Sequence, residues 1–361
     1  MPVESKSTQS LATIRSALSH WYRENARSLP WRAPPGSNAR PDAYRVWLSE
    51  VMLQQTTVAA VTPYYQRFTE RWPTLTDFAA ADPADILAAW AGLGYYSRAR
   101  NLIACARVVA DDHGGAFPET EAGLRALPGI GDYTAAAIAA IAYGEDAVPV
   151  DANVERVIAR LFAIDAPLPA ARKPIREAAR ALWPIEGDGH ISGGDFAQAM
   201  MDLGSSLCTS RSPACLTCPL ADECSGRRLG IAAELPVKPA KRARPVRHGV
   251  ALWIERNGDV WLVRRPDKGM LGGMRALPGS EWVPVEADSV GEVRDSTDET
   301  NTLGTVRHIF THFELRLTVQ RGEPFADAVG EGEWWPISRL DEAGLPTLYR
   351  HAAKIAAEER L

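Results

Sequence analysis

The chain has 361 residues, 46% of them hydrophobic and 24% charged, which is ordinary for a globular protein. This length predicts about two domains, each large enough for its own core. The formal net charge of −5 excludes a uniformly basic surface, so a nucleic-acid partner would have to be held by local basic patches.

Targeting signals and cysteine content indicate a compartment. The polar start, MPVESKSTQS, lacks a basic and apolar leader, and no apolar run is long enough to span a bilayer. We therefore expect a cytoplasmic protein with no membrane partner. Five cysteines in such a chain favour metal or redox use over disulfides.

Helical spacing of apolar residues dominates from about Leu11 to Leu229, which predicts an all-helical region. The stretch Tyr44 to Gln54 reads as a strong helix in which Glu50 lies among apolar neighbours. On this pattern alone a solvent-facing Glu50 is the commoner outcome, and a partly dry pocket is the alternative. Pro63 is expected to begin the following helix.

A short turn from Trp90 to Arg100 combines two glycines, two tyrosines and two arginines. Aromatic rings interleaved with arginine suit stacking on bases and pairing with phosphates. The alternative is that the tyrosines simply fill a helix junction.

Two glycines flank one apolar residue at Gly129-Ile130-Gly131, just ahead of an Ala-rich helical run. Glycines before a helix let backbone N–H groups converge on an anion such as a phosphate. The plainer interpretation is an ordinary helix–turn–helix. Asp151 then reads as the N-cap of the next helix.

The most specific feature is a group of four cysteines with the spacing C-x6-C-x2-C-x5-C: Cys208, Cys215, Cys218 and Cys224. Thiolates packed this densely indicate a shared metal centre, either zinc or a four-iron cluster. Cys105 lies far away in an apolar helical pattern and is interpreted as a buried small residue.

The amino-acid composition changes after residue 229. Residues 230–248 carry three prolines and five Lys or Arg, which predicts a basic linker able to lie along a phosphate backbone. Beyond it, a hairpin around Asn257-Gly258, a strand at 315–319 and a closing helix at 349–361 predict an α+β domain.

These motifs together identify a resemblance. The segments SEVMLQQT, GLGYYSRARNL, LPGIGDYTAAAI and VDANVERV, with the cysteine spacing, resemble the helix-hairpin-helix DNA glycosylases, and within them the MutY-type adenine DNA glycosylases. The resemblance covers nearly the whole chain. It implies an all-α catalytic region with a cluster loop (1–229, loop 208–224), the linker (230–248) and a Nudix-like recognition domain (249–361).

The resemblance also implies a function. It predicts a monomeric base excision repair enzyme that associates with the nucleoid and removes adenine mispaired with 8-oxoguanine, and with guanine, in double-stranded DNA. It makes the metal centre a [4Fe–4S] cluster, which the spacing alone leaves open against zinc.

Residue roles follow from the same resemblance. Glu50 matches the catalytic acid, Asp151 the carboxylate that stabilises a cationic sugar, and Tyr133 the position where glycosylase/lyase members carry a Schiff-base lysine. The residues matching the adenine pocket are Arg27, Leu29, Trp31, Arg32 and Gln198; those inserted near the lesion pair are Gln55 and Tyr95; those in the 8-oxoguanine-reading loop are Phe310, Thr311 and His312; and the phosphate contact is Gly129, Ile130 and Gly131.

Two positions depart from the family pattern. Thr311 stands where the family usually has serine, and Arg275 stands where it commonly has tryptophan. At both positions, the contact made by the usual family residue is therefore not predicted for this chain.

The chemistry of the two carboxyl groups agrees with these roles. Cleaving a purine N-glycosidic bond needs a proton for the leaving base and a negative charge beside the developing oxocarbenium ion. An apolar setting raises a carboxyl pKa, which suits Glu50 as the acid, and a helix N-terminus favours an ionised Asp151.

Features of the sequence disfavour three rival functions. Tyr133 and the additional domain disfavour an endonuclease III-like glycosylase/lyase, and the presence of both Glu50 and Asp151 disfavours a lesion-binding protein without catalysis. The absence of an R-E-x-x-E-E run after Leu277-Pro278-Gly279 disfavours a nucleotide pyrophosphatase.

Overall fold

The computed structural model describes residues 6–37, 40–184, 191–239, 244–266, 269–284, 301–323 and 331–358. The chain forms two compact units, one of residues 1–81 with 101–240 and the other of residues 82–100 with 241–361. The domain boundaries expected at 229 and 249 stay a prediction, and residues 240–243 of the expected linker and 359–361 of the closing helix lie outside the described residues.

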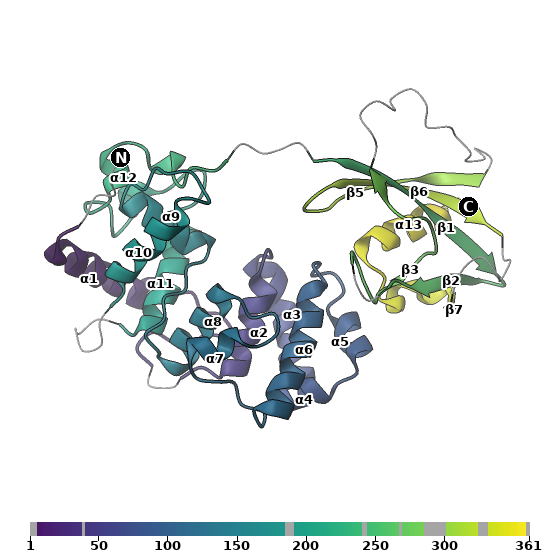
Figure 1. Cartoon of the computed structure of the whole chain (residues 1–361), viewed down its shortest axis with the longest axis horizontal. Coiled ribbons are helices and arrows are strands. Elements are labelled where there is room, and N and C mark those ends of the chain that lie inside the picture. The colour runs from purple at the N-terminus through teal and green to yellow at the C-terminus, as the bar shows by residue number, and fades with distance from the viewer. Residues whose placement is uncertain are drawn as a thin grey trace. The chain divides into compact units, whose positions relative to one another are not determined.

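The first unit is helical, as expected (Figure 1). In the ranges described above, no helix is long and apolar enough to cross a membrane. Its elements are α1 (Thr8–Asn25), α2 (Ala43–Leu53), α3 (Val58–Arg71), α4 (Leu75–Ala80), most of α6 (Ser97–Asp112), α7 (Glu121–Arg125), α8 (Asp132–Ile138), the π-helical turn η1 (Ala139–Tyr143), α9 (Ala152–Leu161), α10 (Arg172–Leu182), α11 (Gly193–Ser206), η2 (Cys215–Thr217), α12 (Ser225–Arg228) and η3 (Ala232–Glu234).

The start of α3 corrects one expectation. Thr57 caps this helix by accepting a hydrogen bond from the Ala60 N–H, so α3 begins at Val58 and Pro63 lies inside it. A hydroxyl cap satisfies a free N–H group of the first turn and sets the helix start more strongly than a proline one turn later.

Helix α11 runs through the core of the first unit. It packs beside α9, α1 and η1, and ten of its fourteen residues are buried. The approach to η1 is close, because a Cβ atom added at Gly194 would lie 2.6 Å from the Ala140 carbonyl oxygen. Glycine at this position therefore sets the distance between α11 and η1.

The second unit combines α5 (Pro83–Ala89) with a mixed sheet, and its β1–β2–β3–β7 and β1–β5–β6 portions enclose α13 (Figure 1). The strand order is β3-β2-β1-β6-β5, with β4 also paired to β1 and β7 to β2. The elements are β1 (Val246–Arg256), β2 (Asp259–Arg264), β3 (Arg275–Ala276), β4 (Val283–Pro284), β5 (Thr302–Ile309), β6 (Glu314–Gly322), β7 (Gly332–Pro336), η6 (Ile337–Ala343) and α13 (Thr347–Glu358).

The expected hairpin is confirmed. Strands β1 and β2 pair antiparallel, with Arg256 opposite Asp259. The two turn residues have positive φ, 54° at Asn257 and 86° at Gly258, as a type I′ turn requires. In contrast, β1 and β6 pair in parallel, so α13 packs against strands of both directions.

The glycine at the start of α11 gives a stability prediction. Gly194→Ala should lower the free energy of unfolding by about 1–3 kcal/mol, because the added methyl must push η1 away. Gly193→Ala is the matched control, since the nearest atom to its Cβ is at 3.4 Å. Urea unfolding of both variants checks this, and equal stabilities would contradict it.

Candidate active site and metal centre

Glu50 is buried on α2, with 8% of the residue exposed, so the solvent-facing interpretation from the helix pattern is wrong. Its carboxyl accepts a hydrogen bond of 2.6 Å from the Tyr133 hydroxyl on α8. Burial raises the pKa of Glu50, the charge of Asp151 raises it further, and the Tyr133 hydrogen bond and Arg32 lower it. The setting therefore favours a protonated carboxyl.

Asp151 is the N-cap of α9, as expected. Its carboxylate accepts hydrogen bonds from the backbone N–H groups of Asn153 at 2.9 Å and Val154 at 2.7 Å, and from the Asn153 side chain at 2.7 Å. Burial raises the pKa of Asp151, and these three donors oppose that rise. Glu50 receives a single such hydrogen bond, so the donors favour Asp151 as the ionised partner.

Tyr133 contacts one of the two carboxyl groups and lies at the same cavity as the other. It contacts Glu50 and lines, together with Asp151, a cavity of about 570 Å³. This volume falls in the range of small-molecule sites. Glu50 is not among the cavity's lining residues and reaches it through Tyr133. The residues that line the cavity include side chains of both charge signs. The basic ones are Arg125, Arg172 and Arg176, and the acidic ones include Glu121, Asp132 and Glu155.

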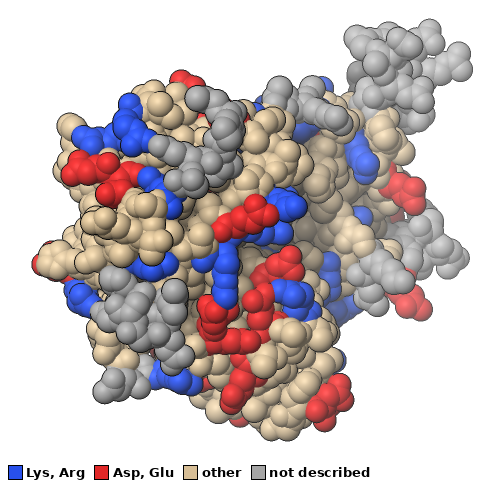
Figure 2. All heavy atoms as spheres, turned by 60° about the vertical axis from the view of Figure 1, so that its left-hand side comes forward, with Lys and Arg blue, Asp and Glu red and all other residues tan. Residues whose placement is uncertain are grey.

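Charges of both signs also share the wider surface. On the face shown in Figure 2, Lys and Arg side chains lie next to Asp and Glu side chains. A DNA contact on such a surface depends on individual arginines, as the net charge of −5 already implied.

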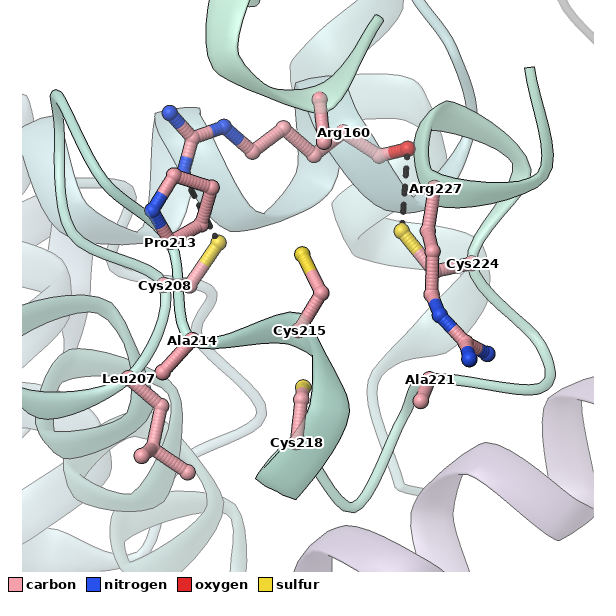
Figure 3. A pocket seen from close by; sticks show the side chains of 11 residues that line it. Arg160, Leu207, Cys208, Pro213, Ala214, Cys215, Cys218, Ala221, Cys224 and Arg227 are labelled. Atoms are coloured by element: carbon pink, nitrogen blue, oxygen red, sulfur yellow. Dashed lines mark hydrogen bonds between the residues drawn. The ribbon is translucent and has the colours of Figure 1, made fainter. Parts of the chain in front are cut away.

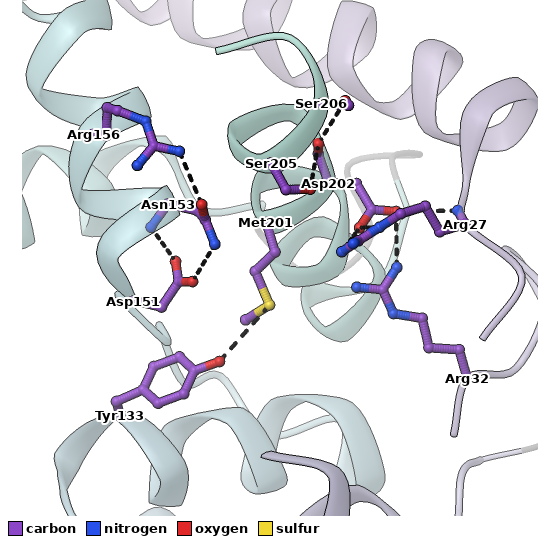
Figure 4. A network of polar contacts seen from close by, with 10 residues as sticks. All are labelled: Arg27, Arg32, Tyr133, Asp151, Asn153, Arg156, Met201, Asp202, Ser205 and Ser206. Carbon is purple, nitrogen blue, oxygen red and sulfur yellow. Dashed lines mark hydrogen bonds and ion pairs between the residues drawn. The ribbon is translucent and has the colours of Figure 1, made fainter. Parts of the chain in front are cut away.

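Asp202 on α11 holds two of the expected pocket residues, and the sequence interpretation missed it. Its carboxylate is 1% exposed and accepts a hydrogen bond of 2.6 Å from Arg27 Nε and one of 2.8 Å from Arg32 Nη1 (Figure 4). The signal in the sequence was an aspartate between Met201 and Leu203 in an apolar helix. Such a residue is rarely buried without a charged partner.

The structure places the other residues expected in the adenine pocket as follows. Trp31 is buried and meets Tyr65 edge to face at 5.1 Å. Gln198 is buried on α11, where its amide donates to the Gly194 carbonyl at 3.4 Å, and Leu29 is half-buried. Met201 on the same helix touches the Tyr133 hydroxyl at 3.8 Å. Helix α11 thus carries Gln198, which is expected in the pocket, and Met201, which contacts Tyr133.

The residues expected near the lesion pair have unusual backbones. Gln55 has a φ of 57° and Tyr95 a φ of 48°, and both are exposed. Within the described chain only five non-glycine residues have positive φ. Such conformations are costly and concentrate at functional sites, so they agree with side chains that project outward.

The glycine turn is a tight junction. Gly129 has a φ of 74°, and a Cβ atom there would lie 2.5 Å from the Cβ of Asn101. The Ile130 N–H donates to the Leu127 carbonyl at 3.2 Å and is already engaged inside the turn. Gly131 caps α8 and has open space where a Cβ would lie. A phosphate contact would therefore fall to the two glycines.

The four cysteines line one pocket, and Arg160 spans it (Figure 3). The Arg160 guanidinium donates to Cys208 Sγ at 3.3 Å, and its carbonyl accepts from Cys224 Sγ at 3.5 Å. Among the described residues, no three His, Cys, Asp or Glu side chains are placed to hold a single metal ion. Four cysteine thiols around one pocket are a donor set that fits a shared metal centre.

A chain of hydrogen bonds runs from Asp151 to the cysteine loop, and Figure 4 shows its first part, from Asp151 through Asn153 to Arg156. Asn153, which donates to Asp151, accepts from Arg156 Nη2 at 2.9 Å. Arg156 Nε in turn donates to the Cys208 carbonyl at 2.7 Å. Asp151 is therefore connected to the cysteine loop through Asn153 and Arg156.

The expected lesion-reading loop connects β5 and β6. Phe310 is half-buried, whereas Thr311 and His312 are exposed at its tip. Arg275 lies in β3, where its guanidinium donates to Glu333 at 2.7 Å and lies 4.5 Å from the ring centre of Trp335. Arg275 is thus engaged inside the second unit.

Comparisons with known proteins agree with this arrangement. Residues 48–184 match the HhH-GPD superfamily base excision DNA repair proteins, residues 208–224 the iron-sulfur binding domain of endonuclease III, and residues 249–354 the NUDIX domain. Human adenine DNA glycosylase is 32% identical over 86% of this chain and 66% of its own length. The mouse protein of the same name is 33% identical over 86% of this chain and 70% of its own.

The chain belongs to the adenine DNA glycosylase family. A solved thermostable thymine-DNA glycosylase is similar at 29% identity and a TM-score of 0.53, covering 61% of this chain and 98% of that protein. For this family member, the match at residues 208–224 supports an iron–sulfur cluster at the four cysteines.

The Asp202 network of this adenine DNA glycosylase family member gives a second prediction. Asp202→Ala should lower the free energy of unfolding by about 3–5 kcal/mol, because Arg27 and Arg32 lose a buried partner. Asp146→Ala, which breaks an exposed pair with Arg180, should change it little. Denaturant titration of both variants checks this, and similar losses would contradict it.

Proposed function

We propose that the protein hydrolyses the N-glycosidic bond of adenine mispaired with 8-oxoguanine, and with guanine, in double-stranded DNA. It acts in base excision repair, as a monomer, and leaves an abasic site with little or no strand cleavage. The observation that carries the proposal is a buried carboxyl, Glu50, hydrogen-bonded to Tyr133 beside the Asp151 cavity. The human and mouse relatives named adenine DNA glycosylase support it.

Glu50 is the general acid. Burial raises its pKa, so the protonated form persists toward neutral pH and can give its proton to the departing adenine ring. The resulting carboxylate then activates the attacking water. Removing the charge on the leaving base is necessary because an adenine anion departs slowly.

Asp151 stabilises the sugar. Three donors at the start of α9 favour its anion, which places a negative charge where the oxocarbenium ion develops. The two carboxyl groups thus take opposite protonation states, Asp151 at the cavity and Glu50 behind Tyr133, as an acid and an electrostatic stabiliser require.

Tyr133 argues for a glycosylase without lyase activity. A lysine at this position would attack the sugar and form an imine, but a phenol cannot. Burial and the nearby carboxylates raise the pKa of Tyr133 well above its usual value, so its hydroxyl stays a hydrogen-bond donor.

Base extrusion and lesion recognition use other parts of the chain. Flipping a base costs a few kcal/mol, which an inserted side chain partly offsets. Gln55 and Tyr95, held with positive φ at exposed turns, take this role. Arg27, Leu29, Trp31, Arg32 and Gln198 form the adenine pocket, and residues 310–312 read 8-oxoguanine.

Cys208, Cys215, Cys218 and Cys224 hold a [4Fe–4S] cluster in this proposal. The cluster serves as a structural prop for the basic loop around it. Arg227 lines the cysteine pocket, and Arg228 follows it on α12, so the fold of this loop determines where these arginines can meet phosphates.

Adenine excision tests the proposed function. Duplexes with one adenine opposite 8-oxoguanine, guanine or thymine are incubated with the purified protein and then cleaved with alkali. We expect cleavage at the first two and none at A:T. Borohydride added during the reaction should trap no covalent adduct. Failure to excise adenine opposite 8-oxoguanine would reject the function, and a strong adduct would reject the monofunctional mechanism.

Glu50→Gln should abolish excision, because the amide has no proton to deliver, while binding to the A:8-oxoguanine duplex persists. Single-turnover rates and gel-shift affinities measure the two effects. Glu70→Gln, at an exposed site on α3, is the control. A rate for Glu50→Gln within about tenfold of the parent would remove Glu50 from the mechanism.

Tyr133→Phe should shift the pH dependence of excision. The Tyr133 hydrogen bond lowers the pKa of Glu50, so its loss raises that pKa further. Because the acid must be protonated, the fall in rate on the alkaline side should move to higher pH. Tyr143→Phe, which removes a hydroxyl bonded to the Phe117 carbonyl, is the control. An unmoved or acid-shifted profile would contradict this coupling.

A further inference from the structure

The loop of residues 310–313 has a backbone fixed by local hydrogen bonds. Ile309 on β5 pairs with Glu314 on β6, and the Phe310 N–H donates to the Phe313 carbonyl at 2.9 Å. These bonds involve main-chain atoms only. They close the hairpin without fixing the direction of the Phe310 ring.

The Phe310 ring lies against three others: it meets His308 edge to face at 4.6 Å, Phe313 at 4.9 Å, and the Trp282 indole, which is the one it stacks on. The Phe310 and Trp282 rings stack with their centres 5.4 Å apart and their planes 29° apart. Trp282 also meets Phe313 at 6.2 Å. Because Phe310 is half-buried while Thr311 and His312 are exposed, Phe310 anchors the loop, and Trp282 supplies the stacked face of the aromatic cluster that holds it.

Trp282 is itself held on the side of β1 and β2. The Arg265 guanidinium lies 4.6 Å from the centre of its ring and donates to the Tyr349 hydroxyl at 2.8 Å. On β1, a Cβ atom at Gly249 would lie 2.5 Å from Trp282 Cδ1, so glycine leaves the room that the indole occupies. The indole therefore has little freedom to move.

We infer that Trp282 is a positioning residue that sets the preference for 8-oxoguanine over guanine opposite adenine. This inference rests on the proposed function. The two bases differ at N7 and C8 alone, so discrimination needs polar groups at the loop tip placed to within a fraction of an ångström. If the ring that anchors the loop can rotate, the polar groups at the loop tip are no longer held in that position.

The test compares single-turnover excision of adenine opposite 8-oxoguanine and opposite guanine. Trp282→Ala should lower the ratio of the two rates by about three- to tenfold, mainly through a slower reaction with 8-oxoguanine. Trp282→Phe should retain most of the preference. Gly249→Ala should act in the same direction as Trp282→Ala, because its methyl displaces the indole without removing it.

Trp261→Ala is the matched control. Trp261 packs on Trp334 with ring centres 5.1 Å apart in the β2–β7 pair of the same unit, so it controls for loss of an aromatic pair. An unchanged ratio in folded Trp282→Ala and Gly249→Ala proteins, or an equal fall in Trp261→Ala, would overturn the inference.

Failure of the proposed function would look different, because the parent would then excise adenine from neither duplex. Gel-shift affinities of the same variants for the two duplexes would still decide the inference, since they require no excision. An affinity ratio that falls in Trp282→Ala but not in Trp261→Ala supports it, and equal ratios overturn it.

Discussion

The site depends on a buried carboxyl that has one hydrogen-bond partner among the described residues. Burying an ionised carboxylate is costly, and one neutral donor at 2.6 Å does not offset that cost, so the environment of Glu50 favours the protonated form. The partner comes from α8, whereas Glu50 lies on α2. The packing of α2 on α8 therefore fixes the hydrogen bond that Glu50, the proposed proton donor, receives from Tyr133.

Small residues on helix α11 allow neighbouring elements of the first unit to pack closely against it. Gly194 allows contact with η1, and at Gly204 an added Cβ would lie 2.6 Å from the Asn153 Cβ. The second contact brings α9 against α11, so that Arg156 can donate to the Gly204 carbonyl at 2.5 Å and support Asn153. Asp202 then fixes Arg27 and Arg32 to the same helix. One element thus sets the relative places of the pocket arginines and of the carboxylate that opens α9.

Sequence patterns predicted the structural features that depend on residues close together in the chain. The cap at Asp151, the Asn257-Gly258 turn and the helical periods are local, and the structure has them. The burial of Glu50 and the pairing of Asp202 with Arg27 are not local, because they depend on residues 83 and 175 positions away. Periodicity indicates which face of a helix is apolar but not what meets a polar residue on it. The family resemblance supplied the role of Glu50, whereas Asp202 had no such guide.

The two departures from the family pattern have different physical consequences. Thr311 is exposed at the loop tip, so its extra methyl group need displace no buried neighbour. Arg275 is different, because its guanidinium is committed to Glu333, Trp335 and the Ala343 carbonyl. An arginine held by an acidic partner, a ring and a carbonyl has little left to offer a phosphate. The substitution at 275 therefore concerns packing inside the second unit, which leaves the proposed recognition of a damaged base to residues 310–312 and the rings that contact them.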